Sequence, residues 1–263
     1  MKRGGGTGSA YARFGASLVL LGAFVAWELR HPEPLMRFGI LQTRTVSGAN
    51  VAGFILGTAL FSMFLMLTLY MQQVLGYSAM KTGLAYLAVA GTAIVWSGVA
   101  GQLVTRVGVK PVLVVGMAML TGGLLWFTQV SVDGSYVADL LPGFLIIGVG
   151  IGFSFVPISI AALAGVKAAE AGLASGLINT SQQIGGALGI AALSTIATSK
   201  TADSVGTGST LPAALVDGFQ SAFLVGAVVA ALGLVAALTL IRRDELEPDV
   251  VADSEVELAL EAA

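Results

Sequence analysis

Residues 218–241 read GFQSAFLVGAVVAALGLVAALTLI and include no charged side chain. A helix needs about 20 consecutive apolar residues to cross the hydrocarbon core of a bilayer, whereas a run of about 10 to 14 is typical of a buried core helix. This stretch is therefore long enough to span a membrane. The remainder of the chain has to be considered with lipid, rather than water, as its solvent.

The composition of the whole chain agrees with that view. Of its 263 residues, 56% are hydrophobic and only 11% are charged, against roughly 25% charged residues in a soluble domain. The chain has no cysteine and one histidine, which excludes a disulfide framework, a thiolate metal site and an imidazole cluster. No nucleophile, base and acid set, phosphate loop or basic nucleic-acid surface is evident. We predict an all-α polytopic membrane bundle that is not an enzyme and holds neither a cofactor nor a metal.

A window of about 20 residues finds seven candidate spans. Six are free of charged residues, at 47–72, 82–103, 112–131, 140–166, 171–199 and 218–241. The seventh, at 14–27, has only a short uncharged run between Arg13 and Glu28. A signal-peptide core is the alternative for this segment, but the glycine-rich residues 4–8 and Arg13 interrupt that pattern. We therefore count it as a helix.

The distribution of Lys and Arg predicts the orientation, because cytoplasmic loops carry an excess of both. With the C-terminus inside, the inner loops hold Arg30, Arg37, Arg44, Arg106, Lys110, Lys167, Arg242 and Arg243. The outer loops then hold only Lys81 and Lys200. Lys2, Arg3 and Arg13 would lie outside, which suggests sequence upstream of Met1. We expect residues 1–46 to form an extra helix and linker, 47–243 a six-helix bundle, and 244–263 a disordered acidic tail.

Polar side chains within spans face partner helices or water-filled cavities. In the second span, one stripe at helical spacing holds Asn50, Phe54, Gly57, Phe61, Phe64, Thr68 and Gln72. This combination of aromatic rings and amides suits the wall of a drug-sized cavity. Ordinary packing through Gly57, with the phenylalanines facing lipid, is the alternative.

The sixth span begins AGLASGLINTSQQIGGALGIAA at residue 171. Asn179, Gln182 and Gln183 predict either hydrogen bonds between helices or direct ligand contact. The pairs Gly172 with Gly176 and Gly185 with Gly189 have the small-xxx-small spacing that lets helix backbones approach. In the fifth span, Gly148, Gly150, Gly152 and Pro157 predict a thin and bent helix.

Acidic side chains are absent from the middle of every predicted span. Asp139 and Asp217 stand at the outer ends of two spans, where a carboxylate is favoured near a helix N-terminus. A proton-driven carrier needs an embedded group that changes charge. These spans alone therefore contain no proton relay.

Residues 101–110, GQLVTRVGVK, resemble the G-x-L-x-D-R-x-G-R-K loop signature of the major facilitator superfamily in its looser C-terminal copy. Gly101, Arg106, Gly108 and Lys110 match, whereas Thr105 replaces the acid and Val109 the second basic residue. Glu33, Pro34 and Leu35, the segment LYMQQVLGYS at 69–78 followed by Gly83, and the sixth span resemble the C-terminal part of EmrB/QacA-type drug:proton antiporters.

That resemblance implies the last seven helices of a fourteen-helix exporter, with one extra helix followed by two inverted three-helix repeats. It implies that the second and fifth spans line the substrate cavity and that the proton-coupling acids lie in an N-terminal half. The expected partners are the lipid bilayer, a small-molecule substrate and that N-terminal half, from the same longer chain, a separate chain or a second copy. A non-transporting membrane scaffold or regulatory subunit is the alternative function. The expected location is the inner cell membrane, with a cytoplasmic C-terminus.

Overall fold

The computed structural model describes residues 6–28, 30–31, 44–164, 166–167 and 170–241. The predicted acidic tail and Glu33, Pro34, Leu35, Arg37, Arg242 and Arg243 lie outside these residues. The chain divides into two compact units, Met1–Ile40 and Leu41–Ala263. The described part of the first unit is essentially one helix, α1 (Gly6–Glu28), which covers the predicted span at 14–27.

The second unit is a helical bundle with no strand among its described residues. Helix α2 (Arg44–Leu69) continues into a π-helical turn, η2 (Tyr70–Val74), and is followed by α3 (Ala79–Ala85) and α4 (Leu87–Val107). Then come α5 (Val109–Phe127), the π-helical turn η3 (Tyr136–Leu140), α6 (Leu141–Leu163), α7 (Ala171–Gly206) and α8 (Leu211–Leu240). Each of the six spans predicted for this unit falls largely on a helix of the described residues, and the predicted fold class is confirmed.

Within the described residues, five helical segments are long and apolar enough to cross a membrane, judged by length and composition: Arg44–Val74, Ala79–Val107, Val109–Phe127, Tyr136–Leu163 and Leu211–Leu240. The segment predicted at 171–199 forms α7 but is not among the five. Its amides, hydroxyls and glycines make α7 more polar than those five segments. The predicted span at 82–103 differs too, since Tyr86 separates α3 from α4.

The predicted loop at 101–110 is mostly helical. Helix α4 continues to Val107, and Gly108 alone links it to α5. Gly108 has φ of 87°, a backbone conformation that glycine adopts readily and other residues rarely do. A glycine is therefore needed at this turn because the link is only one residue long.

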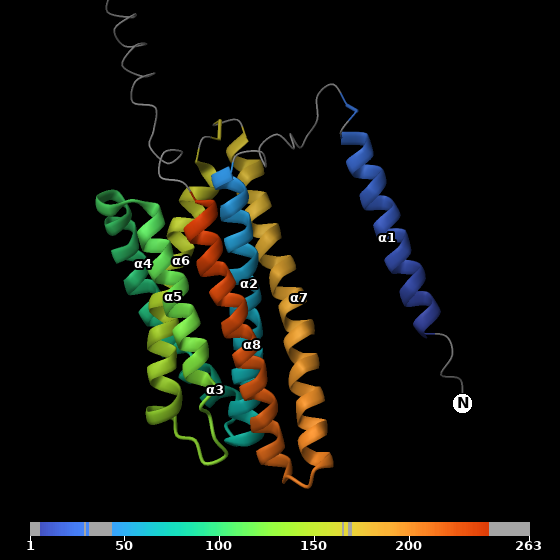
Figure 1. Cartoon of the computed structure of the whole chain (residues 1–263), viewed down its shortest axis with the longest axis vertical. Coiled ribbons are helices and arrows are strands. Elements are labelled where there is room, and N and C mark those ends of the chain that lie inside the picture. Colours follow the sequence, from blue (N-terminus) through green and yellow to red (C-terminus); the bar gives the residue numbers. More distant parts are fainter. Residues whose placement is uncertain (1–5, 29, 32–43, 165, 168–169, 242–263) are drawn as a thin grey trace, which may run out of the picture. The chain divides into compact units, whose positions relative to one another are not determined.

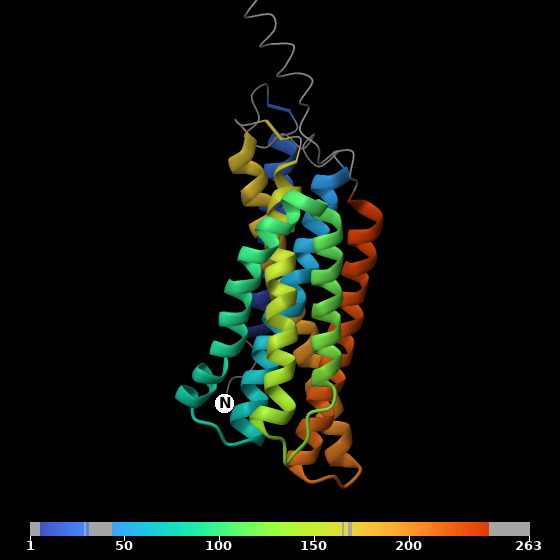
Figure 2. The same ribbon diagram turned by 90° about the vertical axis from the view of Figure 1, so that its left-hand side faces the viewer.

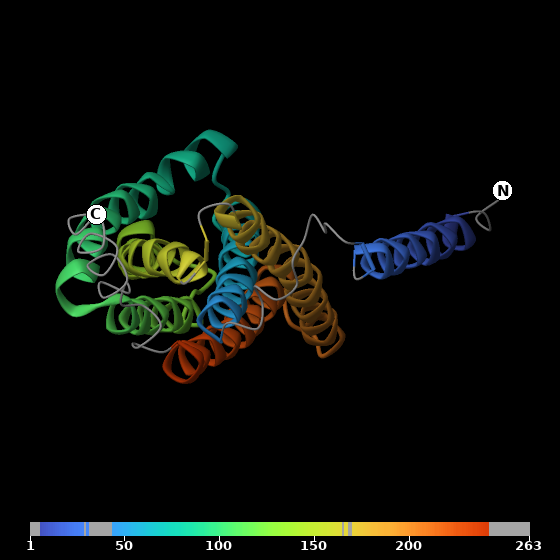
Figure 3. The ribbon, with the colours of Figure 1, turned by 90° about the horizontal axis from the view of Figure 1, so that it is seen from above.

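The six long helices form two groups of three, α2 with α7 and α8, and α6 with α4 and α5 (Figures 1 and 3). Exchanging α2 with α6, α4 with α7 and α5 with α8 maps most of the packed pairs onto one another, with α2–α7 onto α4–α6 and α2–α8 onto α5–α6, whereas the small α6–α7 contact has no comparable α2–α4 counterpart. Helices α2 and α6 run in opposite directions along the bundle (Figure 1). This is the arrangement expected of two inverted repeats, in which the first helix of each repeat packs against the second and third helices of the other.

Glycines bring α2 and α7 into main-chain contact. A Cβ at Gly57 would collide with the main chain of Gln182, and a Cβ at Gly185 with the main chain of Phe54. The Thr58 hydroxyl crosses the same interface and donates to the Gly185 carbonyl at 3.0 Å. Gly189 lies against Thr58 and Ser62. Gly172 and Gly176 differ, since no described atom lies within 4 Å of a Cβ built on either, so the close approach occurs at the second glycine pair.

Helix α6 uses its glycines on two sides. A Cβ at Gly148 would lie 2.6 Å from Thr92, and one at Gly152 2.7 Å from the Ser97 nitrogen, both on α4. On the other side, a Cβ at Gly150 would lie 2.8 Å from the Leu120 nitrogen on α5. Pro157 is buried within α6, which continues through it to Leu163.

Alanine at Gly185 should destabilise the bundle, whereas alanine at Gly176 should not. Overpacking a close contact costs about 1 to 3 kcal/mol, while glycine to alanine in an open helix position gains up to about 1 kcal/mol. Thermal unfolding of the two purified variants in one detergent measures the difference. Equal unfolding temperatures for Gly185→Ala and Gly176→Ala would contradict the α2–α7 contact described above.

Candidate functional site

A cavity of about 160 Å³ lies where α2, α6 and α7 meet. Four of its lining residues, Gly57, Phe61, Phe64 and Gln182, belong to the two polar or aromatic faces recognised in the sequence. The structure adds Leu56, Leu60 and Phe155. The two faces, more than a hundred residues apart in the chain, therefore contribute to one site.

The walls of this cavity are apolar except at Gln182. Three of the lining residues are phenylalanines, and none of the described lining residues is charged. The Gln182 side chain makes no hydrogen bond to any other described residue, so its amide is available to a ligand. Engineered cavities of about 150 Å³ bind benzene. A volume of 160 Å³ therefore suits one aromatic ring or a group of similar size, with one directional polar contact.

Tyr86 holds the Phe64 side of the cavity in place. Its ring packs edge-on against the Phe64 ring, with 5.0 Å between centroids. Its hydroxyl lies 2.9 Å from the Phe64 carbonyl oxygen and 2.9 Å from Thr68 Oγ1. Thr68 itself donates to the Phe64 carbonyl at 2.7 Å, so this predicted cavity residue supports the wall from behind.

The other predicted cavity residues lie elsewhere. Asn50 is buried between α2 and α7, where its Nδ2 donates to the Val46 carbonyl and its Oδ1 accepts from Ser181 Oγ, both at 2.9 Å. Phe54 is half-buried, and its main chain abuts Gly185. Gln72 and Asn179 are exposed, and Asn179 donates to the Ser175 carbonyl at 3.0 Å. Only the middle of the predicted stripe thus lines the cavity.

Sequence reasoning missed Tyr86 and Phe155. Tyr86 lay inside an apparently continuous span, and nothing in its neighbourhood signals the helix break at which it sits. Phe155 lies in α6, a helix expected to line the cavity, but the prediction for that span named only its glycines and Pro157. The phenylalanines of the same span were the available signal.

The motif at the α4–α5 link has a structural role at Gly108. Arg106 is exposed in the last turn of α4, and Lys110 is partly exposed in the first turn of α5. Gly101 has no described atom within 4 Å of a Cβ built on it. The motif therefore combines a tight turn with two accessible positive charges.

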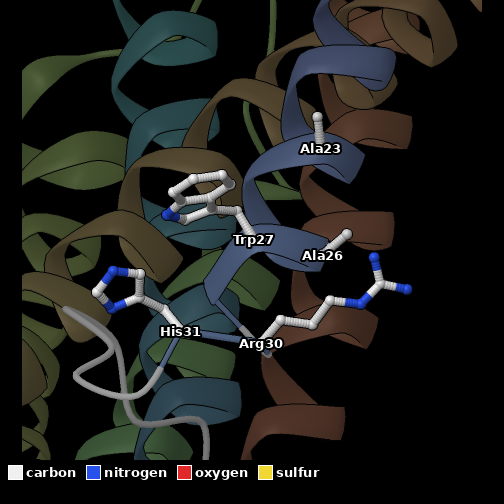
Figure 4. Close-up of a pocket in the computed structure, with 5 residues that line it drawn as sticks. All are labelled: Ala23, Ala26, Trp27, Arg30 and His31. Carbon is white, nitrogen blue, oxygen red and sulfur yellow. The ribbon is translucent and has the colours of Figure 1, made fainter.

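A separate hollow lies at the end of α1, in the first unit. Its described lining residues are Ala23, Ala26, Trp27, Arg30 and His31 (Figure 4). The Trp27 and His31 rings stack with 6.0 Å between centroids, and Arg30 extends from the other side of the helix end (Figure 4). Tryptophan and basic residues are enriched at membrane–water interfaces, so this cluster suits a helix end at that depth.

The chain belongs to the major facilitator superfamily, whose family model matches residues 6–190. It is 35% identical over 220 residues to the puromycin resistance protein pur8 of Streptomyces alboniger, which covers 82% of this chain and 44% of that protein. It is 32% identical over 225 residues to the cephamycin export protein CmcT of Amycolatopsis lactamdurans, covering 85% of this chain and 45% of that protein. A multidrug resistance protein B homolog of Mycobacterium tuberculosis is 34% identical over 183 residues, 69% of this chain and 34% of that protein.

These comparisons confirm the predicted family and identify a multi-pass membrane protein of a transporter family. The chain spans less than half the length of the curated relatives it matches.

The hydrogen bond between Asn50 and Ser181 should stabilise the α2–α7 interface without contacting a ligand. Alanine at either position should lower the free energy of unfolding, and the double variant should lose less than the sum, since such bonds in membrane bundles couple by about 0.6 kcal/mol and at most about 1.7 kcal/mol. A double-mutant cycle in detergent measures the coupling. Strictly additive losses would show that the two side chains do not interact.

Proposed function

We propose that this chain is the C-terminal half of a proton-coupled exporter of drugs or other small amphiphilic molecules, working by alternating access. The cavity between α2, α6 and α7 carries the proposal. Its phenyl rings accept flat apolar groups of varied shape, and the free amide of Gln182 fixes their orientation, as in ligand sites generally. The relatives named for puromycin resistance, multidrug resistance and cephamycin export support this substrate class.

The position of the cavity supports a transport role. Phe61 lies near the middle of the 31-residue segment Arg44–Val74, and secondary transporters bind substrate near the bilayer midplane at the interface between repeats. Helices α2 and α6, which are exchanged by the pseudo-symmetry of the bundle, both contribute side chains to it. Phe61, Phe64, Phe155 and Gln182 are the proposed substrate contacts.

The charge distribution supports a cytoplasmic C-terminus and a location in the inner cell membrane. The start of α2, the α4–α5 link and the end of α8 lie at one end of the bundle (Figure 2). Arg44, Arg106 and Lys110 belong to that end, whereas Lys81 in α3 and Lys200 near the end of α7 belong to the opposite one. The positive-inside rule assigns the Arg-bearing end to the cytoplasm.

Transport requires a second wall for the cavity. We propose that an N-terminal half supplies it, from the same longer chain, a separate chain or a second copy, since the relatives are about twice as long as the matched region. The described residues that line the cavity include no Asp, Glu or His. The proton-binding carboxylates are therefore assigned to the other half, because a carrier needs an embedded group that changes charge.

Replacing Phe61 with alanine should weaken puromycin binding by about 5- to 10-fold, because losing one aromatic contact costs about 1 to 1.4 kcal/mol. Equilibrium dialysis of tritiated puromycin against the full chain in lipid nanodiscs measures the dissociation constant. Leu232→Ala on α8, which shortens an exposed apolar side chain that does not line the cavity, is the control. Identical affinities for wild type and Phe61→Ala would reject this cavity as the binding site.

Efflux should depend on the proton gradient and not directly on ATP. In cells that carry the chain together with its N-terminal half, a protonophore should raise puromycin accumulation to the level of cells without the transporter. ATP depletion under conditions that maintain the gradient should leave efflux unchanged. Efflux that persists after the protonophore has collapsed the gradient would exclude proton coupling.

A further inference from the structure

A second cavity lies nearer the η2 end of the bundle, between α2 with η2, α7 and α8. Its volume is about 220 Å³, larger than that of the first. On α7, Gln182 of the first cavity and Ser194 of the second are 12 residues apart, or about 18 Å at 1.5 Å per residue. On α2, Phe64 of the first and Met66 of the second are only two residues apart, so the cavities are neighbours that share α2 and α7 as walls but have no lining residue in common.

The second cavity has an apolar floor and a polar rim. Met66, Ala197 and Phe219 are buried and come from the three different helices. Gln73 and Thr198 are exposed, and Ser194 is partly exposed beside them. None of the described lining residues carries a charge. This distribution suits a small uncharged molecule with one apolar part and one polar group.

The rim offers hydrogen-bonding groups that the fold does not use. The Gln73 side chain makes no hydrogen bond to any other described residue. Thr198 donates to the Ser194 carbonyl at 2.8 Å, which leaves its oxygen able to accept a further bond. Gln73 stands in the π-helical turn η2, and such turns within α-helices are frequent at functional sites.

The walls of this cavity are held together independently of any ligand. Ser204 on α7 donates to the Asp217 carboxylate on α8 at 2.7 Å. Thr201 on α7 lies so close to Gly218 on α8 that a Cβ added to Gly218 would collide with the Thr201 hydroxyl. Gln220 on α8 donates to the Val130 carbonyl at 2.7 Å. Polar contacts therefore fix α7 and α8 at this end, and the cavity is preformed.

We propose that this second cavity binds a small uncharged amphiphile, with its apolar part on Met66 and Phe219 and its polar group hydrogen-bonded to Gln73 and Thr198. The ligand class rests on the proposed export function. The site lies toward the end of the bundle that the proposed orientation places outside, so it would hold such molecules apart from the central cavity.

The absence of cysteine from the chain permits a direct test with single engineered thiols. Ser194→Cys, which lines the second cavity beside the proposed hydrogen-bonding groups, reports on that cavity. Leu60→Cys reports on the first cavity, and Thr195→Cys, on an exposed part of α7 outside both, serves as the control. Each variant of the full chain in lipid nanodiscs is alkylated with N-ethylmaleimide, with and without 1-naphthol. Circular dichroism and thermal unfolding verify the fold of each.

At 1-naphthol concentrations about four times the dissociation constant, alkylation of the Ser194→Cys thiol should slow about 5-fold, because only about one-fifth of the sites remain free. The rate for Thr195→Cys should not change. Adding Gln73→Leu to Ser194→Cys should raise the half-protecting concentration about 5-fold, the effect of losing one hydrogen bond. Should Ser194→Cys fail to fold, Leu69→Cys reports from the opposite wall.

Three results would overturn the proposal. The first is an unchanged rate at Ser194→Cys. The second is equal slowing at Ser194→Cys and Thr195→Cys, which reports partitioning into lipid. The third is a Ser194→Cys thiol that is protected in nanodiscs without 1-naphthol and reactive in detergent, which assigns the cavity to a lipid acyl chain. Protection at Leu60→Cys alone would reject the second site and leave the export function standing, whereas protection at Ser194→Cys alone would count against the central site.

Discussion

The main-chain contact between α2 and α7 is the constraint on which both cavities depend. Lipid tails are as apolar as leucine, so helices in a bilayer associate through close packing and hydrogen bonds. Gly57 and Gly185 supply the close packing, since each lies against the main chain of the opposite helix. The Thr58 and Asn50 side chains add hydrogen bonds across the same interface. Without these glycines, Phe61 and Gln182 would be held too far apart to line one cavity.

Packing and ligand binding share residues in this interface. Gly57 contacts the Gln182 main chain, and both residues line the central cavity. Gly57 therefore packs against α7 and also borders the central cavity, while the substrate role of that cavity stays a proposal. For Asn50, the hydrogen bonds to Val46 and Ser181 occupy both ends of the amide, which leaves it a packing residue in this structure.

Hydropathy and helical periodicity predicted the helices of the bundle because lipid imposes a minimum length on each span. They also placed Phe61, Phe64 and Gln182 on faces that now meet in one cavity. Periodicity defines a face but not its partner, so it did not separate Gly185, packed on α2, from Gly176, which has open space around it. Nor did it reveal Tyr86, whose role depends on a helix break and on two hydrogen-bond partners in α2.

The contact pattern restricts how such a bundle changes shape. The main chains of α2 and α7 are in direct contact at Gly57 and Gly185. Helices α2 and α6 share a smaller interface, which lies beside the central cavity. The α7–α8 end is fixed in turn by Ser204 and Asp217. The extensive contact between α5 and α8 joins the two groups of three helices, so the six long helices of this unit are held together as one packed bundle. Because packed interfaces respond as discrete units rather than by continuous deformation, the proposed alternating access is assigned to the junction with an N-terminal half and not to a boundary inside this bundle.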